Sequence, residues 1–287
     1  MATIIDSSGI AISAIISQDR PEEIQEGLIR HMILNTIRRY NMQFRDEYGQ
    51  TIIACDGGSW RKDVYEYYKA KRKTGRDESP LDWGEFFRLI NMVRDEIKEH
   101  FQYPVIQVDN AEADDVIATL TKQTQEFGKH EPIMIVSADK DFLQLQRYSN
   151  VKQYSPNKRG LITVEDANFR RFDHVCRGCG GDGVPNTLSA DNVIVESIRQ
   201  SPMRKTKIQE WYDNRDNLES VMDTETYCNF QRNQMLIDFD FIPENIETSI
   251  LEAYEEQRGK KSKGVLNYLI TKRCSMLVEA ASDFQSK

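Results

Sequence analysis

Residues 133–142 read Ile133-Met134-Ile135-Val136-Ser137-Ala138-Asp139-Lys140-Asp141-Phe142, an unbroken apolar run followed by two aspartates. A short apolar run of this kind is typical of a strand that is buried on both faces of a parallel sheet. Three similar runs precede it, at Thr3–Ile5, Thr51–Cys55 and Val105–Val108. Segments with a helical spacing of apolar residues separate the runs, at Leu28–Phe44, Trp83–Phe101 and Asp114–Phe127. This alternation predicts an α/β fold with a parallel central sheet covered by helices.

The periodicity changes near residue 165, beyond which strand-like runs give way to helical spacing. The helical segments are Leu188–Gln200, Arg204–Trp211, Thr224–Leu236, Ile246–Gln257 and Val265–Ala281. A length of 287 residues also suits two domains of ordinary size. We therefore predict an α/β domain at residues 1–170 and a mostly helical domain at residues 171–287.

The composition limits the classes of protein to which this chain can belong. The mean hydropathy is −0.62, and no apolar run approaches the roughly 18 residues that a membrane helix needs, so we expect no membrane association. Five cysteines without framework spacing indicate reduced thiols in a cytosol-like compartment. The net charge of −8 argues against a protein that coats nucleic acid over its whole surface. The basic segment from Arg61 to Arg76 still allows one local contact face.

Acidic side chains follow all four predicted strands at the point where each strand ends. They are Asp6, Asp56, the group Glu112, Asp114 and Asp115, and the pair Asp139 and Asp141. The carboxyl ends of parallel strands meet at one edge of a sheet, where such folds bind ligands. Helix capping explains any one of these acids, but it does not explain the four groups together. Clustered carboxylates repel one another unless a cation compensates, so the pattern predicts a site for Mg²⁺ or Mn²⁺.

The placement of histidine and cysteine supports this metal chemistry. The histidines, His31, His100, His130 and His174, lie outside the acidic motifs, which disfavours a zinc hydrolase and a serine-type triad. Cys176 and Cys179 have the spacing of half a zinc site, but no second ligand pair follows, so we expect no zinc. Two hard ions that clamp the attacking and leaving oxygens favour phosphodiester hydrolysis.

Two segments are candidates for phosphate contact. The first carries cations and aromatic rings at spacings of three and four: Arg61, Tyr65, Tyr68, Lys69 and Arg72. This spacing predicts one helical face suited to nucleic acid, and the alternative is a solvated basic helix whose tyrosines pack inward. The second is a turn with Gly178, Gly180, Gly181 and Gly183 before a predicted helix. Its backbone N–H groups can approach a phosphate, and a plain flexible connection is the alternative.

Taken in order, these motifs resemble the 5′-nuclease superfamily of flap endonucleases and 5′→3′ exonucleases, and within it the ribonuclease H subfamily of T-even-type bacteriophages. The resemblance covers nearly the whole chain. It rests on Ile5–Ser8, Cys55-Asp56, Trp60–Lys62, Tyr67–Lys69, Glu112–Asp115, Ser137–Phe142 and Leu236–Pro243. The Glu-Ala-Asp-Asp and Asp-x-Asp-Phe motifs are fairly specific, and Leu-Ile-Asp-Phe-Asp points to the phage subgroup.

The resemblance implies a PIN-like nuclease domain, a helix–three-turn–helix element and magnesium-dependent cleavage. Seven acids would hold or orient two Mg²⁺ ions, with Mn²⁺ as a substitute: Asp6, Asp56, Glu112, Asp114, Asp139, Asp141 and Asp182. Asp114 and Asp139 would be catalytic. So would Arg61 and Lys69, which would contact the scissile phosphate. The residues implied in nucleic-acid binding are Arg61, Tyr68, Lys69, Arg72, Gly178, Gly180, Gly181, Gly183, Arg204 and Lys205, with a K⁺ ion at the glycine turn.

The implied substrates are branched or nicked duplex DNA and RNA–DNA hybrids, because the family removes RNA primers and short flaps from lagging-strand fragments. The implied partners are a single-strand-binding protein and a sliding clamp. The implied setting is a monomer in the cytoplasm of a phage-infected bacterium.

The glycine turn departs from the family pattern Gly-Asp-x-x-Asp-Asn-x-Pro, because Cys179 replaces the first Asp and Gly183 replaces the Asn. One carboxylate of the second metal position is therefore missing. Three other functions stay open. A haloacid-dehalogenase-like phosphatase needs an Asp where this chain has Ser8, and a PIN-type endoribonuclease does not need the second domain. A non-catalytic protein that binds branched DNA would keep its function when the acids are replaced.

Overall fold

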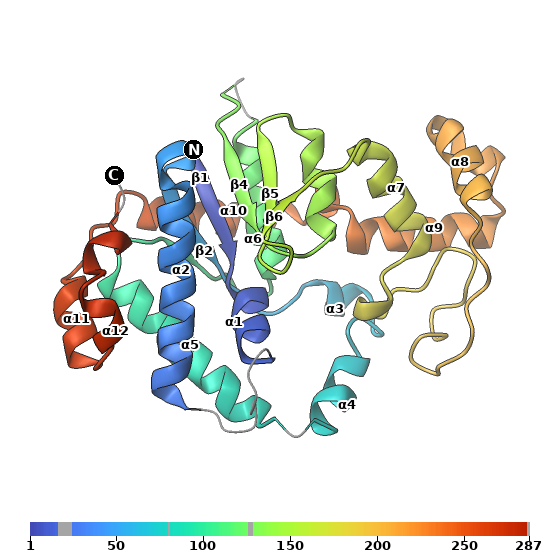
Figure 1. Ribbon diagram of the computed structural model, residues 1–287. Helices are drawn as coiled ribbons and strands as arrows, with labels where there is room; N and C mark the ends of the chain where they lie inside the picture. The colour runs from blue at the N-terminus through green and yellow to red at the C-terminus, as the bar shows by residue number, and fades with distance from the viewer. Residues whose placement is uncertain (17–24, 80, 126–128, 286–287) are drawn as a thin grey trace.

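A six-stranded sheet forms the centre of the computed structural model, which describes residues 1–16, 25–79, 81–125 and 129–285 (Figure 1). The strands are β1 (Ala2–Asp6), β2 (Gln50–Ala54), β3 (Val105–Ile106), β4 (Ile133–Val136), β5 (Val151–Ser155) and β6 (Gly160–Ile162). Their order across the sheet is β3-β2-β1-β4-β5-β6. All neighbouring pairs are parallel except β5 and β6. The predicted parallel sheet is therefore confirmed.

Strands β5 and β6 were not part of the predicted sheet, and β3 is shorter than predicted. β5 alternates buried Val151, Gln153 and Ser155 with the more exposed Lys152 and Tyr154. Its sequence therefore lacks the continuous apolar run that marks a strand buried on both faces. A hairpin at the sheet edge produces this weaker signal because only one face of each strand needs to be apolar.

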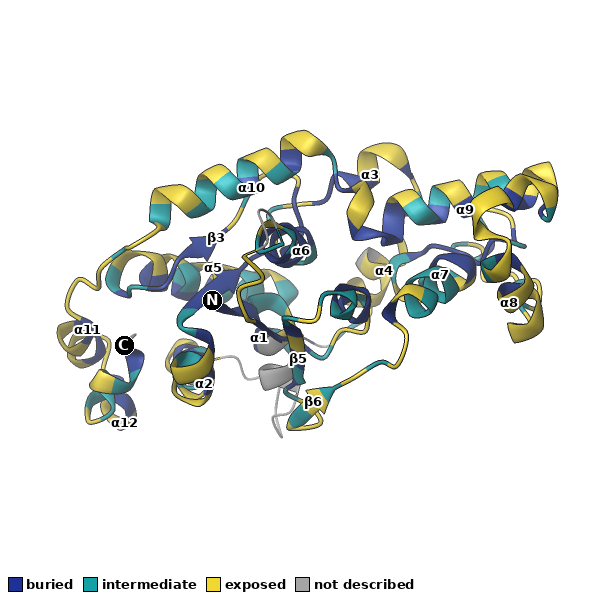
Figure 2. Ribbon diagram, turned by 90° about the horizontal axis from the view of Figure 1, so that it is seen from above, coloured by how far each residue is buried: buried dark blue, intermediate teal, exposed yellow. Residues whose placement is uncertain are grey.

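Helices cover both faces of the sheet (Figure 2). Alternate residues of β1 and β2 belong to the cores on opposite faces. Ile5 and Ile53 pack with α2 (Glu26–Tyr48), α5 (Trp83–His100) and α11 (Val265–Thr271). Ile4 and Ile52 pack with α6 (Ala113–Gln123) and α10 (Glu244–Gln257). The predicted helix Asp114–Phe127 corresponds to α6, and its predicted end lies outside the described residues. None of the helices in the described ranges combines the length and the apolar character needed to cross a membrane.

The predicted helical domain at residues 171–287 is not one packing unit. Helices α7 (Ala167–Arg177), α8 (Lys205–Asp213) and α9 (Thr224–Ile237) pack around Trp211 and Phe230. α7 itself runs across the predicted boundary at residue 170. From Phe239 onward the chain returns to the α/β layer, where α10 packs on α6, and α11, α12 (Ser275–Val278) and Phe284 belong to the same core as α2.

Two predicted helices in this region are wrong. Residues 188–200 form turns, because the Asn186 carboxamide oxygen accepts the N–H of Leu188 at 3.0 Å and the hydroxyl of Ser189 at 2.9 Å. Such local side-chain bonds compete with helical backbone bonds. The predicted helix Val265–Ala281 is interrupted between α11 and α12, where Arg273 has a φ of +56°.

Candidate metal centre

The predicted acids gather at the carboxyl edge of the sheet. Asp6 is the last residue of β1, and Asp139 and Asp141 follow β4. The Asp6 carboxylate accepts the Ser137 hydroxyl at 3.0 Å and the Gly9 N–H at 3.1 Å. A Cβ on Gly9 would lie 2.7 Å from Asp6 Oδ2, so a larger residue here would displace the Asp6 carboxylate. The start of α1 (Ser7–Ile16) thus holds the Asp6 carboxylate in place.

Three carboxylates form the centre of this group. An oxygen of Asp114, one of Asp139 and one of Asp141 all lie within 4.8 Å of one another. Burial raises the pKa of Asp114 well above its ordinary value, and the charge of Asp139 raises it further. Burial and the same neighbour raise the pKa of Asp141 to about 8. Burial also raises the pKa of Asp6 to about 6. Crowded, poorly solvated carboxylates of this kind fit a divalent cation, which stabilises their charged forms.

The other predicted ligands of this edge have partners within the protein. Asp56 Oδ1 accepts the N–H of Ala113 at 2.9 Å, so it caps α6. Glu112, the N-cap residue of α6, accepts the Tyr68 hydroxyl at 2.7 Å and contacts the ammonium of Lys69. Burial alone would raise the pKa of Glu112, but the charges of Lys69 and Arg61 hold it below its usual value. Asp182 pairs with Arg72 at 2.6 Å and lies 3.8 Å from Lys69 Nζ.

The segment that carries Arg61 is not the continuous helix predicted for it. Helix α3 (Arg61–Val64) ends at Tyr65, which has extended backbone, and α4 begins only at Lys71 (Lys71–Asp77). Between them Lys69 adopts a φ of +56°, an uncommon conformation for a residue with a side chain. Tyr65 and Tyr68 are buried, so the inward packing of the tyrosines is the correct alternative. The ring of Tyr68 is not available for stacking on a base.

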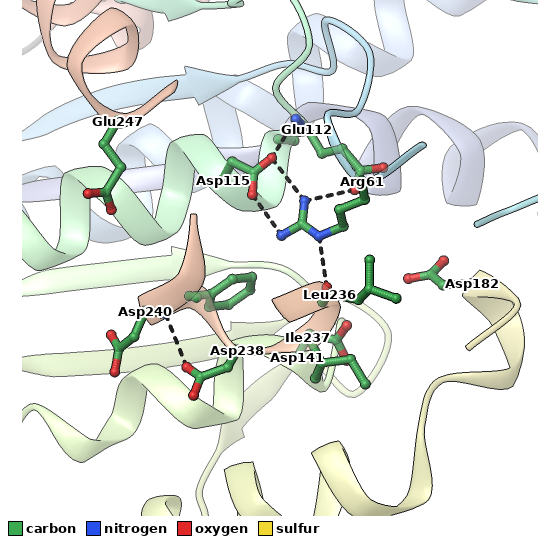
Figure 3. Close-up of polar contacts among 12 residues, drawn as sticks. Arg61, Glu112, Asp115, Asp141, Asp182, Leu236, Ile237, Asp238, Asp240 and Glu247 are labelled. Atoms are coloured by element: carbon green, nitrogen blue, oxygen red, sulfur yellow. Dashed lines mark hydrogen bonds and ion pairs between the residues drawn. The ribbon is translucent and has the colours of Figure 1, made fainter. Parts of the chain in front are cut away.

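Arg61 faces the protein interior and not the open edge of the site (Figure 3). Its guanidinium donates to Asp115 at 2.8 and 3.0 Å and to Glu112 at 3.2 Å, and Nε donates to the Leu236 carbonyl at 2.8 Å. A guanidinium that is 2 % exposed and has these partners cannot contact a scissile phosphate in this arrangement. The predicted role of Arg61 is therefore wrong, whereas the ammonium of Lys69, the other cation predicted to be catalytic, contacts the Glu112 carboxylate.

The glycine turn uses most of its N–H groups internally. Gly178 donates to the His174 carbonyl at 2.9 Å, and Gly183 donates to the Gly180 carbonyl at 3.3 Å. Gly183 has a φ of +78°, and a Cβ on it would lie 2.5 Å from the Tyr67 carbonyl oxygen. Gly178 and Gly183 are thus required by the turn itself, and their contact with phosphate stays a prediction. Gly180 and Gly181 border open space, and their contact with nucleic acid stays a prediction.

The helix expected directly after the turn is missing from residues 188–200, and α8 begins at Lys205. Arg204 and Lys205 are exposed at this helix start. Their contact with nucleic acid, like the K⁺ ion at the turn, stays a prediction. Arg72 is half-exposed at the rim of the site.

His174 and Cys179 belong to the centre, although the sequence analysis placed every histidine outside it. One ligand atom of Asp141, one of His174 and Cys179 Sγ lie within 4.8 Å of one another. His174 Nδ1 is 3.6 Å from Asp141 Oδ1. Burial, together with the charge of Arg170, lowers the pKa of His174 to about 4. Burial, together with Asp182 and Asp141, raises the pKa of the Cys179 thiol to about 12. The sequence placed Cys179 at the second metal position through the family pattern, but for His174 it offers only the closeness of this residue to the same helix end.

Residues of both ligand groups line one cavity of about 620 Å³. Its lining includes Asp6, Asp139, Asp141, His174 and Cys179, with Arg170 and Arg177 from α7. Two adjacent metal positions that share Asp141, an open cavity and a neighbouring lysine suit the hydrolysis of a phosphate ester.

Comparison with known proteins agrees with this chemistry. The model for the 5′–3′ exonuclease N-terminal, resolvase-like domain matches residues 2–172, and the model for the C-terminal region of T4 RNase H matches residues 173–284. The chain belongs to the 5′–3′ exonuclease family. It is a metal-dependent nuclease of this family, with the acids of its site on a PIN-like α/β fold.

Three similar proteins align with different fractions of this chain. The ribonuclease H of Enterobacteria phage T4 is 31% identical over 98% of this chain and 95% of its own length. The flap endonuclease Xni of Shewanella piezotolerans is 36% identical over 39% of this chain and 40% of its own length. A structure of the bacteriophage T5 flap endonuclease with DNA and metal ions has a TM-score of 0.61 at 17% identity and covers 88% of this chain and 99% of that chain. At 17% identity, the similarity to the T5 structure shows only that the two proteins share a fold.

Proposed function

We propose that this nuclease is a magnesium-dependent 5′→3′ exonuclease and flap endonuclease. Its substrates are branched or nicked duplex DNA and RNA–DNA hybrids, from which it removes RNA primers and adjacent DNA on lagging-strand fragments during phage DNA replication. The observation that carries the proposal is the group of Asp114, Asp139 and Asp141 beside Lys69, at the carboxyl edge of the sheet. The full-length similarity to a phage ribonuclease H supports the choice of substrate.

Asp114, Asp139 and Asp141 would hold a Mg²⁺ ion, because hard cations prefer several carboxylate oxygens. Mn²⁺ would substitute for it. When bound, divalent ions at such a centre supply positive charge to the phosphodiester and lower the pKa of water. Asp6 adds negative charge to the same cavity from the end of β1.

Lys69 supplies the cation for the scissile phosphate in this proposal. Its ammonium is mostly buried between Glu112 and Asp182, whose charges raise its pKa although burial alone would lower it. It is therefore charged at neutral pH and held in one place. A fixed cation stabilises the charge that develops on a phosphate better than a mobile one, because it needs no reorganisation. Arg72, Arg204 and Lys205 would bind the duplex backbone.

The proposal extends to the setting of the reaction. We expect a monomer that works in the cytoplasm of an infected bacterium together with a single-strand-binding protein and a sliding clamp. The similarity to the T4 protein over nearly the full length supports this setting.

A digest of labelled 5′-flap, nicked and RNA–DNA substrates, with and without Mg²⁺, tests the proposal. Wild-type protein should cut all three only with the metal, and Asp114→Asn and Asp139→Asn should each lose at least about 10²-fold in single-turnover rate. Asp216→Asn, which replaces an exposed acid far from the centre, is the matched control. Cleavage restricted to single-stranded RNA would favour a PIN-type endoribonuclease instead. Binding without cleavage would favour a non-catalytic DNA-binding protein.

A further inference from the structure

The two metal positions that share Asp141 differ in the chemistry of their ligands. The first offers only carboxylate oxygens, from Asp114, Asp139 and Asp141. The second offers an oxygen from Asp141, an imidazole nitrogen from His174 and a sulfur from Cys179. Hard Mg²⁺ prefers the first set and has little affinity for thiolate or imidazole. A borderline ion such as Zn²⁺ prefers the second.

The spacing of the second set suits a small tetrahedral ion. With zinc–ligand bonds of about 2.0 to 2.3 Å, ligand atoms in a tetrahedron lie about 3.3 to 3.8 Å apart. His174 Nδ1 and Asp141 Oδ1 are already 3.6 Å apart, and all three ligand atoms lie within 4.8 Å. The separation of His174 and Asp141 therefore already matches that of two ligands in a tetrahedral site.

The backbone that carries these ligands is well fixed. Asp166 caps the start of α7, which carries His174, by accepting the N–H of Phe169 at 2.9 Å. The Cys179 carbonyl accepts the N–H groups of Asp182 at 3.1 Å and Val184 at 3.0 Å. The ligands come from the start of the 3₁₀ helix Asp141–Arg147, from α7 and from the glycine turn, so tertiary packing holds them together.

Charges of both signs surround the second set. The cations on α7, Arg170 and Arg177, both pair with Asp173, at 3.3 and 2.8 Å. Asp139 and Lys140 line the same cavity, so Asp139 adds a further carboxylate beside the ligands and Lys140 adds a further cation. The cavity leaves a fourth position for water or a substrate oxygen, as in zinc sites with three protein ligands.

We propose that Asp141, His174 and Cys179 bind one Zn²⁺-class divalent ion in preference to Mg²⁺, beside the carboxylate position. The centre then holds two chemically different ions. The sequence predicted no zinc and a second magnesium position that lacks one carboxylate. In this proposal the second position instead binds a different metal. The proposal rests on the ligand set and does not depend on which nucleic acid the enzyme cuts. Binding converts the Cys179 thiol to a thiolate and releases its proton to the buffer.

Metal titration of the chelator-stripped full-length protein tests the proposal. In millimolar Mg²⁺, we expect wild-type protein to retain one equivalent of Zn²⁺ after equilibrium dialysis, measured by elemental analysis. With Co²⁺ as a spectroscopic substitute, a thiolate-to-metal absorption band should appear in the near-ultraviolet. Cys179→Ser should abolish the band and weaken Zn²⁺ binding more than about 10-fold.

Matched variants distinguish the residues that bind the metal from those that do not. Cys228→Ser removes an exposed thiol and should leave both the band and the affinity unchanged. His174→Asn should weaken Zn²⁺ binding as Cys179→Ser does, and Cys179→Asp should shift the preference back toward Mg²⁺ and Mn²⁺. Thermal unfolding of each variant identifies any that fails to fold. Equal Zn²⁺ binding by wild type and Cys179→Ser, or full displacement of Zn²⁺ by millimolar Mg²⁺, would overturn the proposal whatever the nuclease assay shows.

Discussion

Arg61 and Asp115 form a bidentate ion pair inside the protein, with Arg61 Nη1 3.0 Å from Asp115 Oδ2 and Nη2 2.8 Å from Oδ1. Asp115 Oδ2 also accepts the backbone N–H of Glu112 at 3.0 Å. The pair therefore fixes the first turn of α6, which carries Glu112 and Asp114, and ties it to the Leu236 carbonyl at the end of α9. In this structure Arg61 thus supports the start of the helix that carries Asp114.

Arg61→Ala should lower the free energy of unfolding by about 3 kcal/mol or more, because it leaves the buried Asp115 carboxylate without its partner. Urea denaturation followed by circular dichroism measures the effect. Arg88→Ala breaks an exposed bidentate pair with Glu85 and serves as the control, with an expected loss below about 1 kcal/mol. Equal small losses in the two variants would contradict a structural role for Arg61.

Lys69→Ala should reduce the single-turnover cleavage rate about 10²-fold while the Kd for a flap substrate changes much less. The reason is that the Lys69 ammonium is expected to act mainly on charge that develops in the transition state. Lys71→Ala removes an exposed lysine nearby, whose ammonium donates to the Ser197 hydroxyl at 2.7 Å, and should leave the rate nearly unchanged. A parallel loss of rate and binding in Lys69→Ala would indicate ordinary phosphate binding.

Replacement of Arg204, Lys205 and Lys207 by Ala should flatten the salt dependence of duplex binding. Each phosphate contact contributes about 0.9 to the slope of log K against log salt, so the triple variant should lose roughly 2 to 3. These side chains are exposed at the start of α8. Replacement of Lys98, Lys261 and Lys263, which are exposed elsewhere, keeps the net charge equal and should preserve the slope. An unchanged slope in the first variant removes α8 from the binding face.

Asp139→Asn should stabilise the metal-free protein by about 1 kcal/mol, because it relieves repulsion with Asp114 and Asp141. The same change should remove most of the rise in Tm that Mg²⁺ gives to wild-type protein. Thermal unfolding with and without the metal measures both effects. Asp216→Asn should change neither the stability nor the rise in Tm. A wild-type Tm that does not change on addition of Mg²⁺ would contradict the carboxylate site.

Glu96 should make stability depend on acidic pH. Burial alone would raise its pKa, but hydrogen bonds from Arg30 and Lys272 lower it from 4.5 to about 2. A carboxyl whose pKa is lower in the folded state stabilises the protein above its unfolded pKa, and this stabilisation is lost as pH falls from about 4.5 through about 2. Its size is about 3 kcal/mol. Glu96→Gln should lose this stabilisation at pH 7, and the difference in the free energy of unfolding between the variant and wild type should become smaller in acid. A difference that does not change with pH would contradict this role of Glu96.

Sequence alone determined the core of the fold and the carboxylate position. β1, β2 and β4 are continuous apolar runs, because both faces of an interior parallel strand must be buried, and each run is followed by an acid. Since parallel strands end at one edge, the order of runs and acids along the chain was enough to bring Asp6, Asp139 and Asp141 together.

Only the tertiary structure decided which way Arg61 faces and which atoms surround Asp141. Arg61 was predicted at the open edge, yet burying its guanidinium against Asp115 and the Leu236 carbonyl satisfies donors and acceptors from three distant segments. His174 and Cys179 carry no periodic signal, because their helix end is set against Asp141 by packing between α7 and the 3₁₀ helix Asp141–Arg147. The periodicity of a sequence indicates which face of a helix or strand is buried. Contacts between the ends of helices and strands depend instead on how these elements pack. Asp141, His174 and Cys179 meet through contacts of this second kind.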